Sequence, residues 1–140
     1  MRALLALLLT AACATTAGTV PAERVAGCWI QRDGSGGATT MRWLADASSP
    51  GALRGEKAVT SGDGGAGAHE VYRLEPNGDA WTLCQIETAG ERCWQVAEGA
   101  EGSLEGGRAF IDTHREDLRI TIVGDGADRV VFQGARDGCD

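Results

Sequence analysis

The chain has few aromatic residues, little proline and hardly any histidine. Its 140 residues include two Phe, one Tyr, four Trp, three Pro and two His. This length accommodates one domain, which excludes a multidomain enzyme. The 20 acidic side chains outnumber the 13 basic ones, for a net charge of -7. The composition therefore lacks the basic excess that is typical of a nucleic-acid-binding domain, and we expect no nucleic acid among the partners.

Motifs that carry catalytic chemistry are also missing. The sequence has no Gly-x-Ser-x-Gly and no Gly-Lys-Ser/Thr motif, which argues against a serine hydrolase and a phosphate-binding loop. Gly62–Gly67 matches Gly-x-Gly-x-x-Gly, but an expected strand rather than a helix follows it, so we interpret it as a turn. There is no Cys-x-x-Cys pair, and His69 and His114 stand apart. We expect no catalytic residue, no metal and no cofactor.

The first 17 residues resemble a secretory signal peptide. Arg2 supplies a positive charge, and the apolar run that starts at Ala3 is too short to span a membrane and ends in small residues. Residues 9–13 (Leu-Thr-Ala-Ala-Cys) are similar to a bacterial lipobox, in which Cys13 would carry the lipid. We therefore expect either an outer-membrane lipoprotein or a soluble periplasmic protein of a Gram-negative bacterium. Residues 18–26 are expected to be a linker and 27–140 the folded domain.

Four cysteines remain after export, and an even number in an oxidising compartment predicts two disulfides. Residues 81–96 are typical of a hairpin. With residues 87–90 as its loop, Cys84 lies directly opposite Cys93, close enough to form a disulfide. By elimination Cys28 pairs with Cys139, which joins the start of the fold to its end.

Short apolar stretches alternate with clusters of glycine, aspartate and serine, a pattern that predicts an all-β fold. We expect an antiparallel meander of eight or nine strands, closed into a small barrel because closure removes exposed sheet edges; a sandwich is the alternative. The Asn77-Gly78 pair predicts a tight hairpin turn. Helical turns are expected only near residues 21–25 and 45–51. The predicted strands cover residues 27–32, 39–44, 53–60, 69–75, 81–86, 92–98, 108–112, 117–123 and 129–133.

Gly27-Cys28-Trp29 resembles the Gly-x-Trp opening of lipocalin-like barrels, in which the tryptophan closes the barrel floor. The whole chain after residue 17 is similar to a family of exported bacterial lipocalin-like (calycin-type) domains of unknown function. That family tends to carry Asn-x-x-His-Asp-Phe-Pro, where residues 112–118 here keep only His114. The resemblance implies a barrel and an envelope location. Its other matching segments are residues 26–29, the strand around Trp43, and residues 53–55, 70–74 and 107–111.

Aromatic residues are the candidates for a ligand cavity, because a small barrel holds either packed side chains or one small ligand. They are Trp29, Trp43, Tyr72, Trp81 and Trp94. His114 has acidic neighbours and is interpreted as a histidine that hydrogen-bonds backbone carbonyls at a strand connection, with a metal site as the alternative. Arginine supplies 12 of the 13 basic residues. Arg42, Arg73 and Arg119 are expected on the outer face; arginines pointing inward would indicate an anionic ligand.

These features favour a monomeric, non-enzymatic module of the cell envelope. We expect it to bind a small apolar ligand or an envelope protein, and to contact a membrane only through a lipid on Cys13. The alternative function is a periplasmic inhibitor of a protease or lysozyme. In that case the exposed loop at residues 61–67 would be the inhibitory element.

Overall fold

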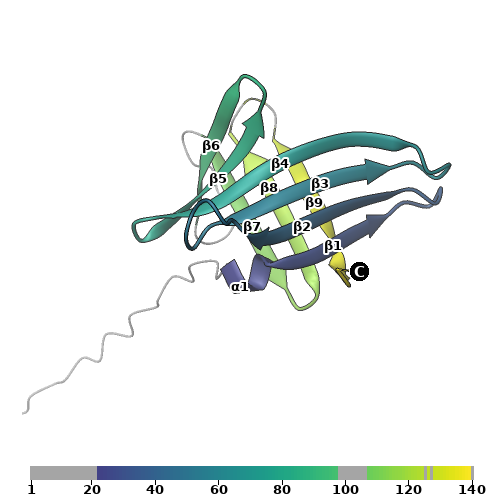
Figure 1. Ribbon diagram of the computed structural model, residues 1–140, viewed down its shortest axis with the longest axis horizontal. Helices are drawn as coiled ribbons and strands as arrows, with labels where there is room; N and C mark the ends of the chain where they lie inside the picture. The colour runs from purple at the N-terminus through teal and green to yellow at the C-terminus, as the bar shows by residue number, and fades with distance from the viewer. Residues whose placement is uncertain (1–21, 98–106, 125, 127, 140) are drawn as a thin grey trace, which may run out of the picture.

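The structure is a computed structural model that describes residues 22–97, 107–124, 126 and 128–139. Nine strands form one closed barrel in sequence order, as Figure 1 shows, and a four-residue helix, α1 (Ala22–Val25), precedes them. The signal peptide and Cys13 lie outside the described residues. The strands are β1 (Gly27–Arg32), β2 (Ala38–Ala45), β3 (Leu53–Thr60), β4 (Ala66–Asn77), β5 (Ala80–Glu87), β6 (Gly90–Val96), β7 (Arg108–His114), β8 (Asp117–Val123) and β9 (Arg129–Asp137).

This architecture confirms the predicted all-β barrel with two disulfides. Three strands, β1, β3 and β8, have the predicted bounds. β4 begins three residues earlier than expected, because the small residues 66–68 pair with β3 although their pattern carries no apolar alternation. β9 extends four residues further than expected and pairs with β1.

Two local predictions differ in detail. Residues 45–51 form no helical turn: Ala45 ends β2, and the Asp46 side chain accepts a hydrogen bond from the Ser48 amide in a turn that closes through Ala52. The Asn77-Gly78 hairpin is confirmed, but Asn77 pairs with Ala80, so the two-residue loop is Gly78-Asp79. Gly78 has a φ of 62°, as the first loop position of a type II′ turn requires.

One strand pair is parallel, which the expected antiparallel meander did not include. β6 runs parallel to β7, with Gln95 opposite Arg108 and Val96 opposite Ala109, and every other neighbouring pair is antiparallel. The cause is parity. Strand direction cannot alternate around a closed ring of nine strands, so at least one neighbouring pair must be parallel.

Both predicted disulfides are confirmed. Cys84 and Cys93 face each other across β5 and β6 in the expected register, with Leu83 opposite Trp94. Cys28 and Cys139 join the strands that close the barrel, where β1 pairs with β9 over only three residues. In Figure 1 the C-terminus accordingly lies beside β1.

The end of the barrel next to α1 is closed. Val25 is fully buried, and the indole Nε1 of Trp29 donates a hydrogen bond of 2.9 Å to its carbonyl oxygen. The Arg136 guanidinium lies 4.2 Å from the centre of the Trp29 ring and donates hydrogen bonds to the carbonyls of Arg24 and Ala26. Residues 22–26, expected to belong to a linker, therefore pack onto the barrel. No helix in the described ranges is long and apolar enough to cross a membrane.

Gly55 makes room for Trp43 in the core, so Gly55→Ala should destabilise the barrel. A β-carbon at residue 55 would lie 2.7 Å from the Trp43 ring carbons Cζ3 and Cη2. We expect a loss of about 1–3 kcal/mol in the free energy of unfolding, measured by urea denaturation of the oxidised protein. The matched control is Gly34→Ala, where no atom lies within 4 Å. Equal stability of the two variants would contradict this packing.

The two disulfides should differ in their contribution to stability. Cys28 and Cys139 are 111 residues apart and Cys84 and Cys93 only 9 apart. In the chain-entropy account the longer loop contributes about 5 kcal/mol and the shorter about 3 kcal/mol. Replacing the Cys28–Cys139 pair by alanines should therefore lower the urea midpoint more than replacing Cys84–Cys93. The reverse order would show that the hairpin disulfide carries the structure.

Candidate functional site

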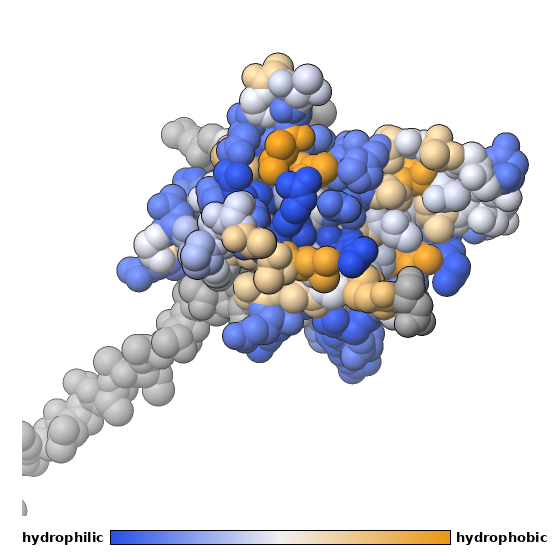
Figure 2. Space-filling view, viewed as in Figure 1, coloured by the Kyte–Doolittle hydropathy of each residue, from blue (hydrophilic) through white to orange (hydrophobic). Residues whose placement is uncertain are grey.

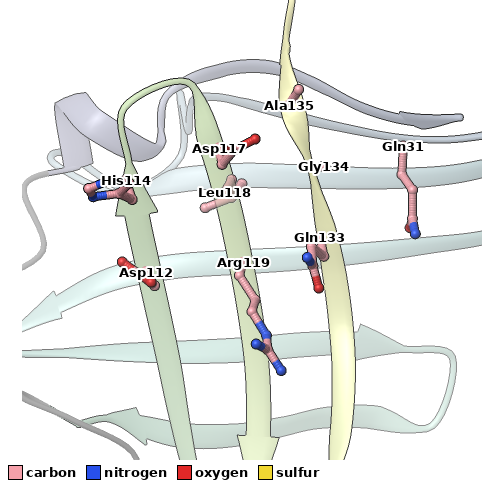
Figure 3. A pocket seen from close by; sticks show the side chains of 9 residues that line it. All are labelled: Gln31, Asp112, His114, Asp117, Leu118, Arg119, Gln133, Gly134 and Ala135. Atoms are coloured by element: carbon pink, nitrogen blue, oxygen red, sulfur yellow. The ribbon is translucent and has the colours of Figure 1, made fainter.

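An open groove of about 490 Å³ lies on the outside of the barrel, where β7, β8 and β9 meet β1. Figure 3 shows its lining side chains, with His114 and Asp117 at the β7–β8 turn, Arg119 and Gln133 lower on β8 and β9, and Gln31 across the groove on β1. No serine or cysteine lines it. The groove thus brings His114 together with carboxylates but not with a nucleophile.

His114 lies at the end of β7, beside the turn to β8. Its imidazole is exposed at the last residue of β7, and among the described residues it makes no side-chain hydrogen bond to a carbonyl. The interpretation as a carbonyl-bonded histidine therefore stays a prediction. The described residues hold one group with metal-ligand spacing, which is Cys84, Glu91 and Cys93. Both of its sulfur atoms are in the disulfide and are not available to a metal.

The aromatic candidates for a ligand cavity lie in the apolar core. Trp29, Trp43, Tyr72 and Trp94 are at most 4% exposed, and Trp81 is partly buried against the same cluster. The indole Nε1 of Trp43 is the one buried side-chain polar atom in the described ranges without a hydrogen-bond partner. The aromatic residues therefore fill the lower part of the barrel. Whether they also contact a ligand stays a prediction.

Above this core the inward face of the barrel carries charge. Tyr72 is fully buried, and its cross-strand partners Gly55 and Gln85 therefore share its inward face. Residues two positions along each strand point the same way, which places Lys57, Glu70 and Arg92 inside. Arg129 lies opposite the buried Ile122 and faces inward as well. We call the six polar residues the mouth cluster: Lys57, Glu70, Tyr72, Gln85, Arg92 and Arg129.

These side chains form a connected network. The Lys57 ammonium lies 2.7 Å from Glu70 Oε2, and the Tyr72 hydroxyl donates a hydrogen bond of 2.9 Å to the same oxygen. The Arg129 guanidinium donates a hydrogen bond of 3.0 Å to the side-chain amide oxygen Oε1 of Gln85. Lys57 and Glu70 retain 18% and 26% side-chain exposure although they face inward. An inward side chain meets solvent only where a barrel opens, so this level is the barrel mouth.

The network sets the ionisation of its members. Partial burial raises the pKa of Glu70, but hydrogen bonds from Lys57 and Tyr72 outweigh burial and hold that pKa below its ordinary value. Burial, followed by the hydrogen bond to Glu70, raises the pKa of Tyr72 well above its usual range. Glu70 is therefore ionised and Tyr72 neutral near pH 7.

Two guanidinium groups lie close to the Trp94 ring. The Cζ atoms of Arg92 and Arg129 are 5.5 and 5.7 Å from the ring centre, within the range of cation–π attraction. Arg92 also pairs with Glu87 at the hairpin end, at 3.3 Å. Arg42 and Arg119 are exposed on the outer face, as expected, and Arg73 pairs there with Glu75 and Glu91. The inward arginines of the mouth cluster are Arg92 and Arg129.

Of the mouth cluster, only Tyr72 is a ligand-site candidate on sequence grounds. A signal exists: Lys57, Glu70 and Arg92 each stand two residues from an inward residue, in phase with the buried face. Charged residues at such positions are normally assigned to the outer face, which hid the site.

The chain has no match among protein-family models, curated proteins or solved structures.

The Glu70 carboxylate should make stability depend on pH. Because its pKa is lowered on folding, its contribution is present above the ordinary value of 4.5 and is lost as the pH falls below it. Glu70→Gln should therefore lose less stability than the wild type between pH 6 and pH 3, measured by urea unfolding at each pH. Glu56→Gln, in an exposed pair with Arg54, should follow the wild-type curve. Parallel curves for Glu70→Gln and wild type would contradict the network.

Proposed function

We propose that the protein is a non-enzymatic binding module of the cell envelope, which takes up a small ligand at the mouth of its barrel. The observation that carries the proposal is the mouth cluster, a set of hydrogen-bonded charges on the inward face of a closed sheet. Inward charges cost desolvation free energy, and a fully apolar interior would avoid that cost. Their retention above a packed aromatic layer is what a site for a polar ligand group requires.

The envelope location rests on covalent chemistry. The two disulfides are typical of a protein that folds outside the reducing cytosol. The apolar segment at the N-terminus supports export, and Cys13 supports an outer-membrane lipoprotein, with a soluble periplasmic protein as the alternative. A closed barrel with Trp29 beside α1 agrees with the resemblance to exported lipocalin-like domains. We propose membership of that family on these grounds.

The ligand expected from the sequence was apolar. The packed aromatic core moves the proposed site upward, to a level where the lining is polar and charged. A ligand that fits this lining carries a polar head for the mouth cluster, and the apolar core beneath favours an apolar part as well. We therefore propose a small amphipathic molecule.

A second candidate function has its own supporting observation. The loop at Ser61–Gly65 is closed by hydrogen bonds between Ser61 and Gly65, and Asp63 accepts a further bond from the Gly65 amide. It packs against the neighbouring turn, where Gly62 lies close to the Ser35 carbonyl. The two turns end the long hairpins that project from the barrel in Figure 1. A rigid projecting loop suits a protein inhibitor that acts through that loop.

The two functions predict different binding surfaces. We would titrate the ¹⁵N-labelled protein, purified from a host that exports it, with a library of small amphipathic molecules. Ligand uptake at the mouth should shift the Trp94 indole, the Gln85 side-chain amide and the Tyr72 amide in NMR spectra. The amides of Gly62 and Gly64 report on the projecting loop and serve as the control.

No mouth shift with any compound would overturn the proposal. Shifts confined to Gly62 and Gly64 would do the same and would favour the loop as the functional element. Figure 2 shows apolar residues interspersed with hydrophilic ones on the visible face, and the large exposed apolar side chains in the described ranges are Leu44 and Val130.

A further inference from the structure

We infer that the ligand carries an anionic oxygen group, a carboxylate or a phosphate, and that Arg129 is the residue that binds it. This inference rests on the proposed function and names the chemistry of the ligand head. It follows from three observations: the pairing of charges in the mouth cluster, the contacts that hold Arg129 in place, and the Trp94 ring beneath its guanidinium.

Among the residues that the structure describes, Arg129 is the inward cation of the mouth cluster without an ion-pair partner. Lys57 is neutralised by Glu70 at 2.7 Å, and Arg92 is paired with Glu87 at 3.3 Å. Within the described residues, Arg129 has no carboxylate at ion-pair distance. Its polar contacts are with neutral groups, the side-chain amide oxygen of Gln85 and the Tyr72 hydroxyl. The mouth therefore carries an excess positive charge in a protein whose net charge is -7.

Glu70 is the carboxylate of the mouth cluster, and it is the described group of that cluster that could repel an incoming anion. Its Oε2 atom already accepts hydrogen bonds from Lys57 and from the Tyr72 hydroxyl, so two donors already stabilise the negative charge of this carboxylate. Arg129 contributes an attraction to Glu70 without reaching it as an ion pair. The Lys57–Glu70 pair is thus neutral overall. It does not neutralise the charge of Arg129.

Arg129 is also held in position for binding. The Gln85 carbonyl occupies one side of its guanidinium, and Trp94 lies beneath at 5.7 Å. A guanidinium has five N–H donors, so most remain available, and their planar fork matches the two oxygens of a carboxylate or phosphate. Because the side chain is half-buried, such a bond forms at lower dielectric than one on the surface.

A series with one tail and different heads tests the inference. We would measure the affinity of the exported protein for hexanoate, hexyl phosphate, hexan-1-ol and hexylamine, by calorimetry and by the shift of the Trp94 indole resonance. Hexanoate or hexyl phosphate should bind at least tenfold more tightly than hexan-1-ol, because charge-assisted hydrogen bonds are worth more than neutral ones. Inorganic phosphate alone distinguishes recognition of the free ion from recognition of the amphipathic molecule.

Arg129→Gln should remove that tenfold preference, and Arg129→Lys should keep part of it because the charge stays while the fork is lost. Arg54→Gln, at an exposed arginine paired with Glu56, is the matched control and should keep the full preference. If Arg129→Gln does not fold, Arg129→Lys still tests the inference, because it keeps the charge and removes the guanidinium fork.

The outcomes separate the two proposals. Equal or tighter binding of hexan-1-ol or hexylamine at the mouth would overturn the anionic head and leave ligand uptake standing. Retention of the preference in Arg129→Gln would overturn the assignment to Arg129. If no member of the series shifts the mouth resonances, both the inference and the mouth as a binding site fail.

Discussion

Closure of the sheet is the constraint on which the rest of this structure depends. The closing contact is small, since β1 and β9 pair over three residues, and the Cys28–Cys139 disulfide lies beside it. The interior of the closed sheet is reached by solvent only at the open end. An inward residue can therefore be polar or charged near that end, whereas it has to be apolar near α1. The parallel pair that closure of nine strands requires is β6 and β7, the pair with the fewest cross-strand partners among consecutive strands.

Height divides the interior into two layers with different energetics. Near α1 the interior is aromatic and dry, Trp29 is anchored by a backbone carbonyl, and the unpartnered Nε1 of Trp43 is a desolvated donor of the kind that costs about 1–3 kcal/mol. Above it, Tyr72 bridges the layers, because its ring belongs to the core and its hydroxyl bonds to Glu70. A neutral phenol at that boundary lets one side chain satisfy both environments.

The fold was predictable because its signals are local. Turn residues and apolar alternation mark nine strands, and the opposed positions of Cys84 and Cys93 follow from hairpin register alone. The candidate site was less predictable. Lys57, Glu70 and Arg129 occupy inward positions where alternation predicts apolar residues, and only the closed register shows that they are brought together. The parallel pair was missed because the relative direction of adjacent strands depends on how many strands the whole barrel contains. No single segment of the sequence encodes that number. His114 attracted attention through its acidic neighbours, which in the structure line an outer groove.

The net negative charge of the chain contrasts with the positive charge of Arg129 at the mouth. In a protein with 20 acidic and 13 basic residues, an uncompensated inward cation is not expected from composition. Arg129 has acidic alternatives nearby in the network, yet Glu70 is engaged by Lys57 and Tyr72, and Glu87 by Arg92. Glu70 and Glu87 thus each pair with a different cation, and within the described residues Arg129 is held in place by the neutral Gln85 and Tyr72 side chains instead. A purely structural role for Arg129 would be better served by a carboxylate at residue 85, since a half-buried charge is most stable when it is paired. Glutamine at that position fixes the guanidinium and, in the proposed function, leaves its charge for the anionic group of the ligand.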